Sequence, residues 1–222
     1  MSNLMVVAGA TGLVGASAID IALQRGWRVI ALARNPAKLK QRAGLETIAA
    51  DFDDLSTLAD TLKPQAPKAF LCALGTTIGI AGSQPAFAKV DRDYVAAFAR
   101  LGVLCGARSF GLVSAVGASA ASANFYLRTK GEAEDAVRAA GYDHVEIARP
   151  SFLVGERIEN RPGEGLATAV SRALSPLLAG PLSKYRPISG ADVAGALVAG
   201  LELPQRGLFI RHYADLRAMA RA

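Results

Sequence analysis

Three glycines near the start of the chain place the strongest constraint on its fold. Gly9, Gly12 and Gly15 directly follow the apolar run Leu4–Ala8, and they overlap the segment Val14–Arg25, whose apolar residues recur at helical spacing. The first glycine permits a tight turn out of a strand, the second leaves the backbone bare, and the third lets a helix pack closely on a sheet. We therefore predict a strand, a tight turn and a helix whose first N–H groups can bind a phosphate.

The rest of the chain alternates apolar runs with segments of helical periodicity. Further strands are predicted at Trp27–Ala33, Leu45–Ala49, Lys68–Ala73, Ser109–Ser114, His144–Ala148 and Gly207–Arg211. Helices are predicted at Leu55–Leu62, Pro85–Leu101, Asn124–Ala140 and Asp192–Leu201, and a long loop at 74–83. This alternation indicates βαβ units, and right-handed crossovers then give an α/β fold with a doubly wound, mostly parallel Rossmann sheet.

The length and the glycine and proline content suggest one domain with an appended lobe. A chain of 222 residues is long enough to bury a single core, so we predict one Rossmann domain over 1–222. The stretch 151–187 breaks the strand–helix rhythm with glycines and prolines around one helical segment, Leu166–Ala179. We expect it to form a small C-terminal substrate lobe over one edge of the sheet.

Composition excludes several classes of function. The formal net charge is +6, but the basic residues are scattered with no run of five, which argues against a nucleic-acid partner. No apolar run reaches the length of a membrane span, so no membrane association is expected. Cys72 and Cys105 lie in separate apolar stretches and are predicted to be buried thiols of a cytosolic protein. His144 and His212 have no second ligand at useful spacing, so no metal site is predicted.

The glycine turn and the end of the second strand indicate a dinucleotide. Thr11, Leu13 and Val14 complete the turn and are expected to contact the phosphates with the three glycines. NAD sites typically have an acidic residue about 20 positions after the glycine turn. This chain has Arg34 there, and an arginine can bind the 2′-phosphate of NADP(H). We therefore predict NADP(H), with NAD(H) as the alternative. Asp51, with Phe52, either contacts the adenine or caps the following helix.

Three polar residues form a candidate catalytic set. Tyr126 and Lys130 are four residues apart on a predicted helix, so both lie on one face. Ser114 ends the preceding strand, at the edge where open α/β sheets bind ligands. Tyr126 would exchange a proton with a substrate oxygen, Lys130 would favour the tyrosinate and hold the nicotinamide ribose, and Ser114 would hydrogen-bond that oxygen. The simpler alternative gives neither residue a catalytic role: Tyr126 would be an aromatic on the helix face, and Lys130 would be a solvated charge.

Several motifs together resemble one superfamily. They are the glycine turn 9–15, the loop 73–77, Lys89-Val90-Asp91, the stretch 112–118, the stretch 125–132 and Arg149-Pro150. They look like the short-chain dehydrogenase/reductase superfamily, and within it the atypical NAD(P)-binding branch of NmrA-like and Tat-interacting-protein-like proteins. The resemblance implies that Leu74, Gly75 and Thr76 line the cofactor. It further implies that Pro150 and Ser151 border the nicotinamide, and that Ser114, Tyr126 and Lys130 occupy the catalytic positions.

The sequence also departs from that pattern. Many superfamily enzymes carry an Asn on the fourth helix, whereas Lys89–Leu101 contains none and Asp91 is the nearest polar residue. We predict an NADP(H)-dependent oxidoreductase acting on a small carbonyl or alcohol. The alternative is a non-catalytic NADP(H)-binding redox sensor that binds a protein partner, and a homodimer is left open. An epimerase or dehydratase would need a larger substrate lobe than this chain has.

Overall fold

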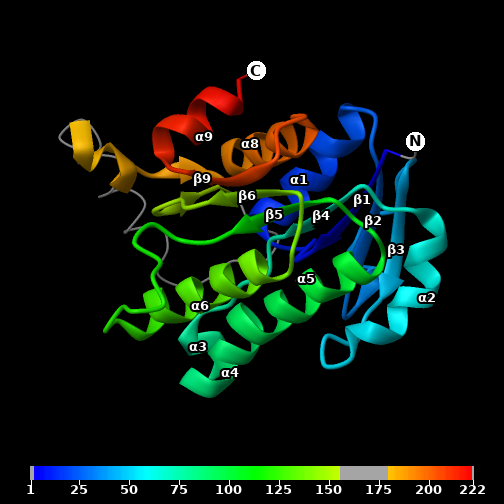
Figure 1. Ribbon diagram of the computed structural model, residues 1–222, viewed down its shortest axis with the longest axis horizontal. Helices are drawn as coiled ribbons and strands as arrows, with labels where there is room; N and C mark the ends of the chain where they lie inside the picture. The colour runs from blue at the N-terminus through cyan, green and yellow to red at the C-terminus, as the bar shows by residue number, and fades with distance from the viewer. Residues whose placement is uncertain (1–2, 156–179, 222) are drawn as a thin grey trace.

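A single parallel sheet organises the chain. The computed structural model describes residues 3–155 and 180–221. Its main sheet has seven strands in the order β3-β2-β1-β4-β5-β6-β9, and every neighbouring pair is parallel (Figure 1). These strands are β1 (Leu4–Ala8), β2 (Arg28–Ala33), β3 (Leu45–Ala49), β4 (Ala69–Cys72), β5 (Ser109–Val113), β6 (His144–Ala148) and β9 (Gly207–Arg211). The predicted doubly wound α/β fold is confirmed.

Helices cover both faces of the sheet, which explains why the central strands are apolar throughout. Figure 1 shows α1 (Leu13–Gln24), α8 (Gly190–Glu202) and α9 (Tyr213–Met219) over one face. The other face carries α2 (Ala59–Leu62), α5 (Tyr94–Leu104) and α6 (Phe125–Ala139). Every residue of β1 is fully buried between these two layers. Cys72 and Cys105 are free and buried, as predicted.

The predicted helix Pro85–Leu101 differs most from the structure. The segment consists of α4 (Gln84–Ala88), a π-helical turn at Lys89–Asp93, and α5, which continues past Gly102 to Leu104. Gly102 lies inside α5 and does not end it. Its missing side chain leaves room for Tyr142 to pack against the helix. A β-carbon on Gly102 would lie 2.1 Å from the Tyr142 hydroxyl oxygen. The predicted loop 74–83 is also interrupted, by the short helix α3 (Ile78–Ala81).

Part of the predicted lobe can be described. β7 (Leu153–Val154) pairs in parallel with β8 (Ile188–Ser189), and a 3₁₀ segment at Gly180–Tyr185 precedes β8. The predicted helix Leu166–Ala179 lies outside the described residues. At the start of α8, Ser189 caps the helix by accepting the N–H of Asp192, and Asp192 pairs with Arg217.

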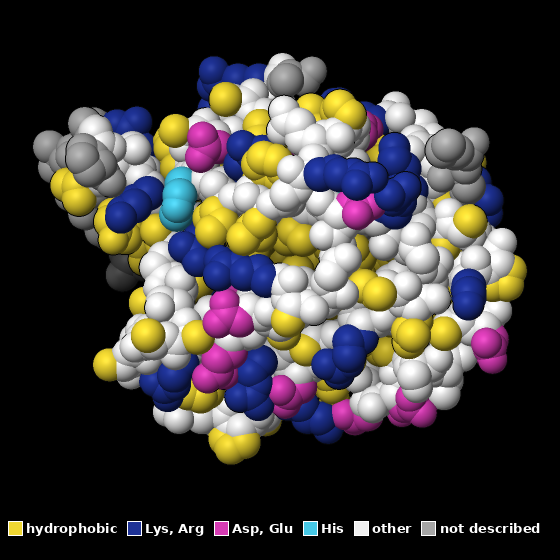
Figure 2. Space-filling model, in the orientation of Figure 1, with side chains coloured by type: hydrophobic (Ala, Val, Ile, Leu, Met, Phe, Trp, Pro, Cys, Tyr) yellow, Lys and Arg dark blue, Asp and Glu magenta, His cyan; other side chains and the backbone are white. Residues whose placement is uncertain are grey.

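The visible surface carries both signs of charge. Figure 2 shows Lys and Arg side chains distributed over this face, interspersed with Asp and Glu and with hydrophobic side chains. Over the described residues, no helix combines the length and the apolar character that crossing a bilayer requires.

Candidate functional site

The order of the strands reverses at β1, which has β2 on one side and β4 on the other. Connections that leave such a pair diverge, and open α/β sheets bind ligands at the carboxyl ends of these strands. Gly9 follows β1 and Ala73 follows β4, and their backbones touch at this point. Gly9 has a φ of +82°, and a β-carbon on it would lie 2.4 Å from the Ala73 carbonyl carbon. Only glycine satisfies both conditions.

The other two glycines shape the turn into α1. The Gly12 N–H donates to the Gly9 carbonyl oxygen at 3.0 Å, which closes the turn. A β-carbon on Gly15 would lie 2.1 Å from that same oxygen, so Gly15 lets the helix start beneath the turn. Thr11 and Gly12 are exposed, Leu13 is half-buried, and Val14 and Gly15 are buried. The turn is therefore exposed to solvent at Thr11 and Gly12, whereas the start of α1 is packed against the rest of the protein.

The start of α1 fits a phosphate. Gly12 is its N-cap residue, no side chain caps the helix, and its first turn contains no acidic residue. The first N–H groups of a helix have no partner within the helix, and the helix dipole is positive at this end. A dinucleotide diphosphate would satisfy these donors, so the residues present fit the cofactor that the sequence predicts.

The residues predicted to bind the adenosine end surround the carboxyl ends of β2 and β3. Arg34 is exposed and pairs with no carboxylate within 3–155 and 180–221. Asp51 is also exposed, and its carboxylate accepts the N–H of Asp53 at 2.9 Å. The next helical turn starts after Asp54, so Asp51 does not cap it. Phe52 is 5% exposed and packs in the core against Tyr94.

Tyr126 and Lys130 lie one turn apart on α6, as the spacing predicted. The Tyr126 ring is 39% exposed and lies beside Phe87 of α4, with ring centroids 5.8 Å apart. The Lys130 side chain is only 8% exposed, and its Nζ lies 2.7 Å from Oδ1 of Asp91. Burial alone would lower the pKa of Lys130, but the facing Asp91 carboxylate and Tyr126 outweigh burial and raise it. Lys130 is therefore a buried cation, not a solvated one.

Ser114 is hydrogen-bonded to a buried carboxylate. It is 5% exposed, and its hydroxyl donates to Oε1 of Glu134 at 2.5 Å. Glu134 also receives two hydrogen bonds from Arg149, at 2.8 and 2.6 Å, and one from Arg138 at 3.4 Å. The structure thus joins Ser114 to a buried carboxylate between β5, β6 and α6.

The loops predicted to line the cofactor meet α6, the helix that carries Tyr126 and Lys130. Thr76 donates its N–H to Oδ2 of Asp91 at 2.8 Å. A β-carbon on Gly75 would lie 3.5 Å from Oδ1 of Asp91 and 3.9 Å from Nζ of Lys130, so the loop passes directly over this ion pair. Leu74 is half-buried next to them. After β6, Pro150 is buried and accepts the Val116 N–H. The Ser151 hydroxyl donates to the Arg186 carbonyl oxygen.

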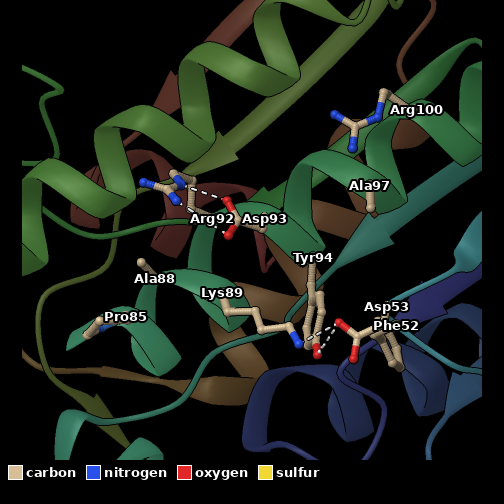
Figure 3. A pocket seen from close by; sticks show the side chains of 10 residues that line it. All are labelled: Phe52, Asp53, Pro85, Ala88, Lys89, Arg92, Asp93, Tyr94, Ala97 and Arg100. Atoms are coloured by element: carbon tan, nitrogen blue, oxygen red, sulfur yellow. Dashed lines mark hydrogen bonds and ion pairs between the residues drawn. The ribbon is translucent and has the colours of Figure 1, made fainter. Parts of the chain in front are cut away.

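A separate hollow lies along the outer side of α4 and α5. Its volume is about 480 Å³, and Figure 3 shows how its side chains lie. Lys89 and Tyr94 both reach Asp53, at 2.7 and 3.1 Å. Of the predicted site residues only Phe52 lines this hollow, and Phe52 belongs to the core. The charged side chains of the hollow therefore belong to the helix surface and not to the candidate site.

Two buried acids complete the site, and the sequence analysis gave neither of them a role. Helical spacing places Asp91 on the apolar stripe that includes Phe87 and Val95. The same argument places Glu134 beside Ala133 and Val137 on the buried face of α6. A carboxylate on an apolar stripe is a signal for a buried partner, and this signal was available from the sequence. Among the described residues no cluster of His, Cys, Asp or Glu could hold a metal ion.

Comparison with known proteins identifies the family. A family model described as NAD(P)H-binding matches residues 9–204. The chain belongs to this NAD(P)H-binding family. The protein FMP52 of Candida albicans is 30% identical over 210 residues, covering 91% of this chain and 88% of that protein. HTATIP2 of Rattus norvegicus is 40% identical over 117 residues, covering 53% of this chain and 47% of that protein. The predicted membership of an atypical NAD(P)-binding branch is confirmed.

Solved structures show the same fold. The enzyme WbmH of Bordetella bronchiseptica, in complex with NAD⁺, superposes with a TM-score of 0.72 at 14% identity, covering 96% of this chain and 76% of that one. MoeE5, in complex with UDP-glucuronic acid and NAD, has a TM-score of 0.71 at 20% identity, covering 93% and 74%. Family and fold together support a nicotinamide cofactor and an oxidoreductase-like architecture.

The comparison corrects the predicted compartment. The fungal relatives from Candida albicans and Emericella nidulans, the latter 34% identical over 180 residues, are named mitochondrial proteins. The expected cytosolic location is therefore wrong. Unpaired thiols indicate a reducing environment, and this does not distinguish the cytosol from other reducing compartments.

Proposed function

We propose that this chain is an NADP(H)-dependent oxidoreductase that reduces a small carbonyl compound or oxidises the corresponding alcohol. The observation that supports this most is the position of Lys130. Its ammonium is buried, charged and held under the loop that is expected to line the cofactor. Tyr126 lies one helical turn away, with an exposed ring that substrate and water can reach. A buried cation beside an accessible tyrosine suits proton transfer.

The residues divide the reaction between them. The nicotinamide, when bound, supplies or accepts a hydride. Tyr126 donates its phenolic proton to the carbonyl oxygen while the carbonyl carbon gains the hydride, so the product is an alcohol. Lys130 stabilises the tyrosinate that remains until solvent returns the proton. In the oxidative direction the same tyrosine removes the alcohol proton.

NADP(H) is favoured over NAD(H) by the surroundings of Arg34. The guanidinium is exposed at the end of β2 and pairs with no described carboxylate. A guanidinium can bind a 2′-phosphate through two parallel hydrogen bonds. The 2′-hydroxyl of NAD(H) offers no such charge.

The experiment is NADPH oxidation measured over a panel of small aldehydes and ketones. We expect Tyr126→Phe to lower kcat by at least about 100-fold, the usual size of a general-acid contribution. Tyr94→Phe is the matched control, since the Tyr94 hydroxyl bonds Asp53 and not Lys130, and phenylalanine keeps the ring that packs on Phe52. Equal rates for Tyr126→Phe and the wild-type protein would remove Tyr126 from the mechanism.

A non-catalytic NADP(H)-binding regulator is the second candidate, and Ser114 favours it. Its hydroxyl proton is donated to Glu134, so in this geometry Ser114 has no proton to offer a substrate oxygen. This candidate predicts NADPH binding by titration calorimetry without oxidation by any carbonyl in the panel. Turnover that depends on Tyr126 would exclude it.

A further inference from the structure

Asp91 is a buried acid that connects three elements of the site. It lies in the π-helical turn Lys89–Asp93 between α4 and α5, and it is 1% exposed. One carboxylate oxygen lies 2.7 Å from Nζ of Lys130 on α6. The other accepts the N–H of Thr76, in the loop after β4, at 2.8 Å. Short π-helical segments occur frequently at functional sites, and this one carries the contact between catalytic helix and cofactor loop.

Few ionisable groups face the Lys130 ammonium. They are Cys72 of β4, Asp91 of the π-helical turn and Tyr126 of α6. Burial raises the pKa of the Cys72 thiol to about 12, so this thiol remains neutral over the range in which enzymes work. The loop after β4 contributes an N–H group and Gly75 but no charge. Among the described residues, Asp91 is therefore the one negative charge that faces Lys130.

We propose that Asp91 is a positioning residue that holds the Lys130 ammonium under the cofactor loop and acts as its counter-charge. The proposal rests on the function proposed above, because it assigns Asp91 to the same proton transfer.

The sign of the effect on Lys130 follows from the Asp91 charge. The carboxylate stabilises the Lys130 ammonium and therefore opposes the loss of its proton. Removing the charge lowers the pH at which Lys130 releases its proton. For a charge this close and this buried, we expect a change of about 1–3 pH units.

The test follows Lys130 directly by NMR, using protein labelled with ¹³C at the lysine ε-carbon. The Lys130 signal is assigned by its absence from Lys130→Met. In the wild-type protein this ammonium should lose its proton at higher pH than the exposed lysines. In Asp91→Asn it should lose its proton about 1–3 pH units lower than in the wild type, and Asp91→Glu should restore most of the difference. Asp93→Asn is the control, because Asp93 lies on the same turn but is exposed and paired with Arg92.

The second readout is the pH dependence of kcat/KM for NADPH-dependent reduction of the best carbonyl in the panel. Its alkaline limb should move to lower pH in Asp91→Asn and stay in place in Asp93→Asn. An unshifted Lys130 titration, or an unshifted limb in an active enzyme, overturns the proposal. If Asp91→Asn does not fold, a wild-type Lys130 that loses its proton no later than the exposed lysines overturns it equally. If no carbonyl is reduced, the proposed function fails while the lysine titration still tests the charge of Asp91.

Discussion

Gly9 and Ala73 touch backbone to backbone where the strand order of the sheet reverses. A β-carbon on Gly9 would lie 2.4 Å from both the carbonyl carbon and the carbonyl oxygen of Ala73. Gly9 follows β1 and Ala73 follows β4, so this contact places the glycine turn 9–15 against the loop after β4. In that loop, the Thr76 N–H donates to the Asp91 carboxylate. The turn predicted to bind phosphate and the loop that contacts Asp91 therefore meet at one close approach that only glycine permits.

The substitution Gly9→Ala should abolish NADPH binding and destabilise the fold. Its φ of +82° is unfavourable for alanine, and the new methyl group meets backbone that cannot move aside. Gly26→Ala is the matched control, since Gly26 has a φ of +80° with nothing within 4 Å of its β-carbon position. We expect the control to lose about 1–2 kcal/mol of unfolding free energy from backbone strain alone. Urea unfolding should show a larger loss for Gly9→Ala, and equal losses would contradict the clash.

The substitution Arg34→Ser should weaken NADPH binding and leave NADH binding nearly unchanged. A charge-assisted hydrogen-bond pair to a 2′-phosphate is worth about 1.5–3 kcal/mol, or roughly 10- to 150-fold in Kd. Arg28→Ser is the control, because Arg28 is an exposed arginine at the opposite end of the same strand. Titration calorimetry with both cofactors measures the ratio. A wild-type protein that prefers NADH would remove the role assigned to Arg34.

The substitution Glu134→Gln should lower the free energy of unfolding by about 3 kcal/mol, because it leaves a largely buried Arg149 without its counter-charge. Asp135→Asn, one residue along, breaks only an exposed pair with Arg138 and should cost less than about 1 kcal/mol. Chemical denaturation of both variants measures the difference. If both cost the same, the Glu134 cluster does not stabilise the junction of β5, β6 and α6.

Stability should fall as the pH drops through the titration of His212. Burial and the nearby Arg149 lower its pKa in the folded protein. Below the unfolded pKa of about 6.5, the unfolded chain therefore binds the proton more readily, and the His212 contribution is lost as the pH falls through the folded pKa. His212→Asn should lose less stability than the wild type between about pH 7.5 and about pH 5. Melting curves at both pH values check this, and parallel losses in the two proteins would refute it.

The sequence alone determined the architecture and predicted the location of the candidate site. Alternating apolar runs and helical periods specify the parallel sheet, because burial on two faces requires continuous apolar strands. Gly9, Gly12 and Gly15 specify the phosphate turn, because their lack of side chains is a local property of the chain. The spacing of Tyr126 and Lys130 likewise follows from helix geometry.

Tertiary structure decided which partners the polar groups have. The helix predicted at Pro85–Leu101 stops before Gly102, yet α5 continues through Gly102 to Leu104, and Tyr142 packs against this glycine. Ser114 was assigned to the substrate, yet it donates to Glu134, a residue 20 positions along the chain. Asp91 and Lys130 are 39 positions apart and meet only because α5 and α6 pack side by side on one face of the sheet. Propensity and spacing describe neighbours along the chain, whereas the charge environment of a buried group depends on elements that folding brings together.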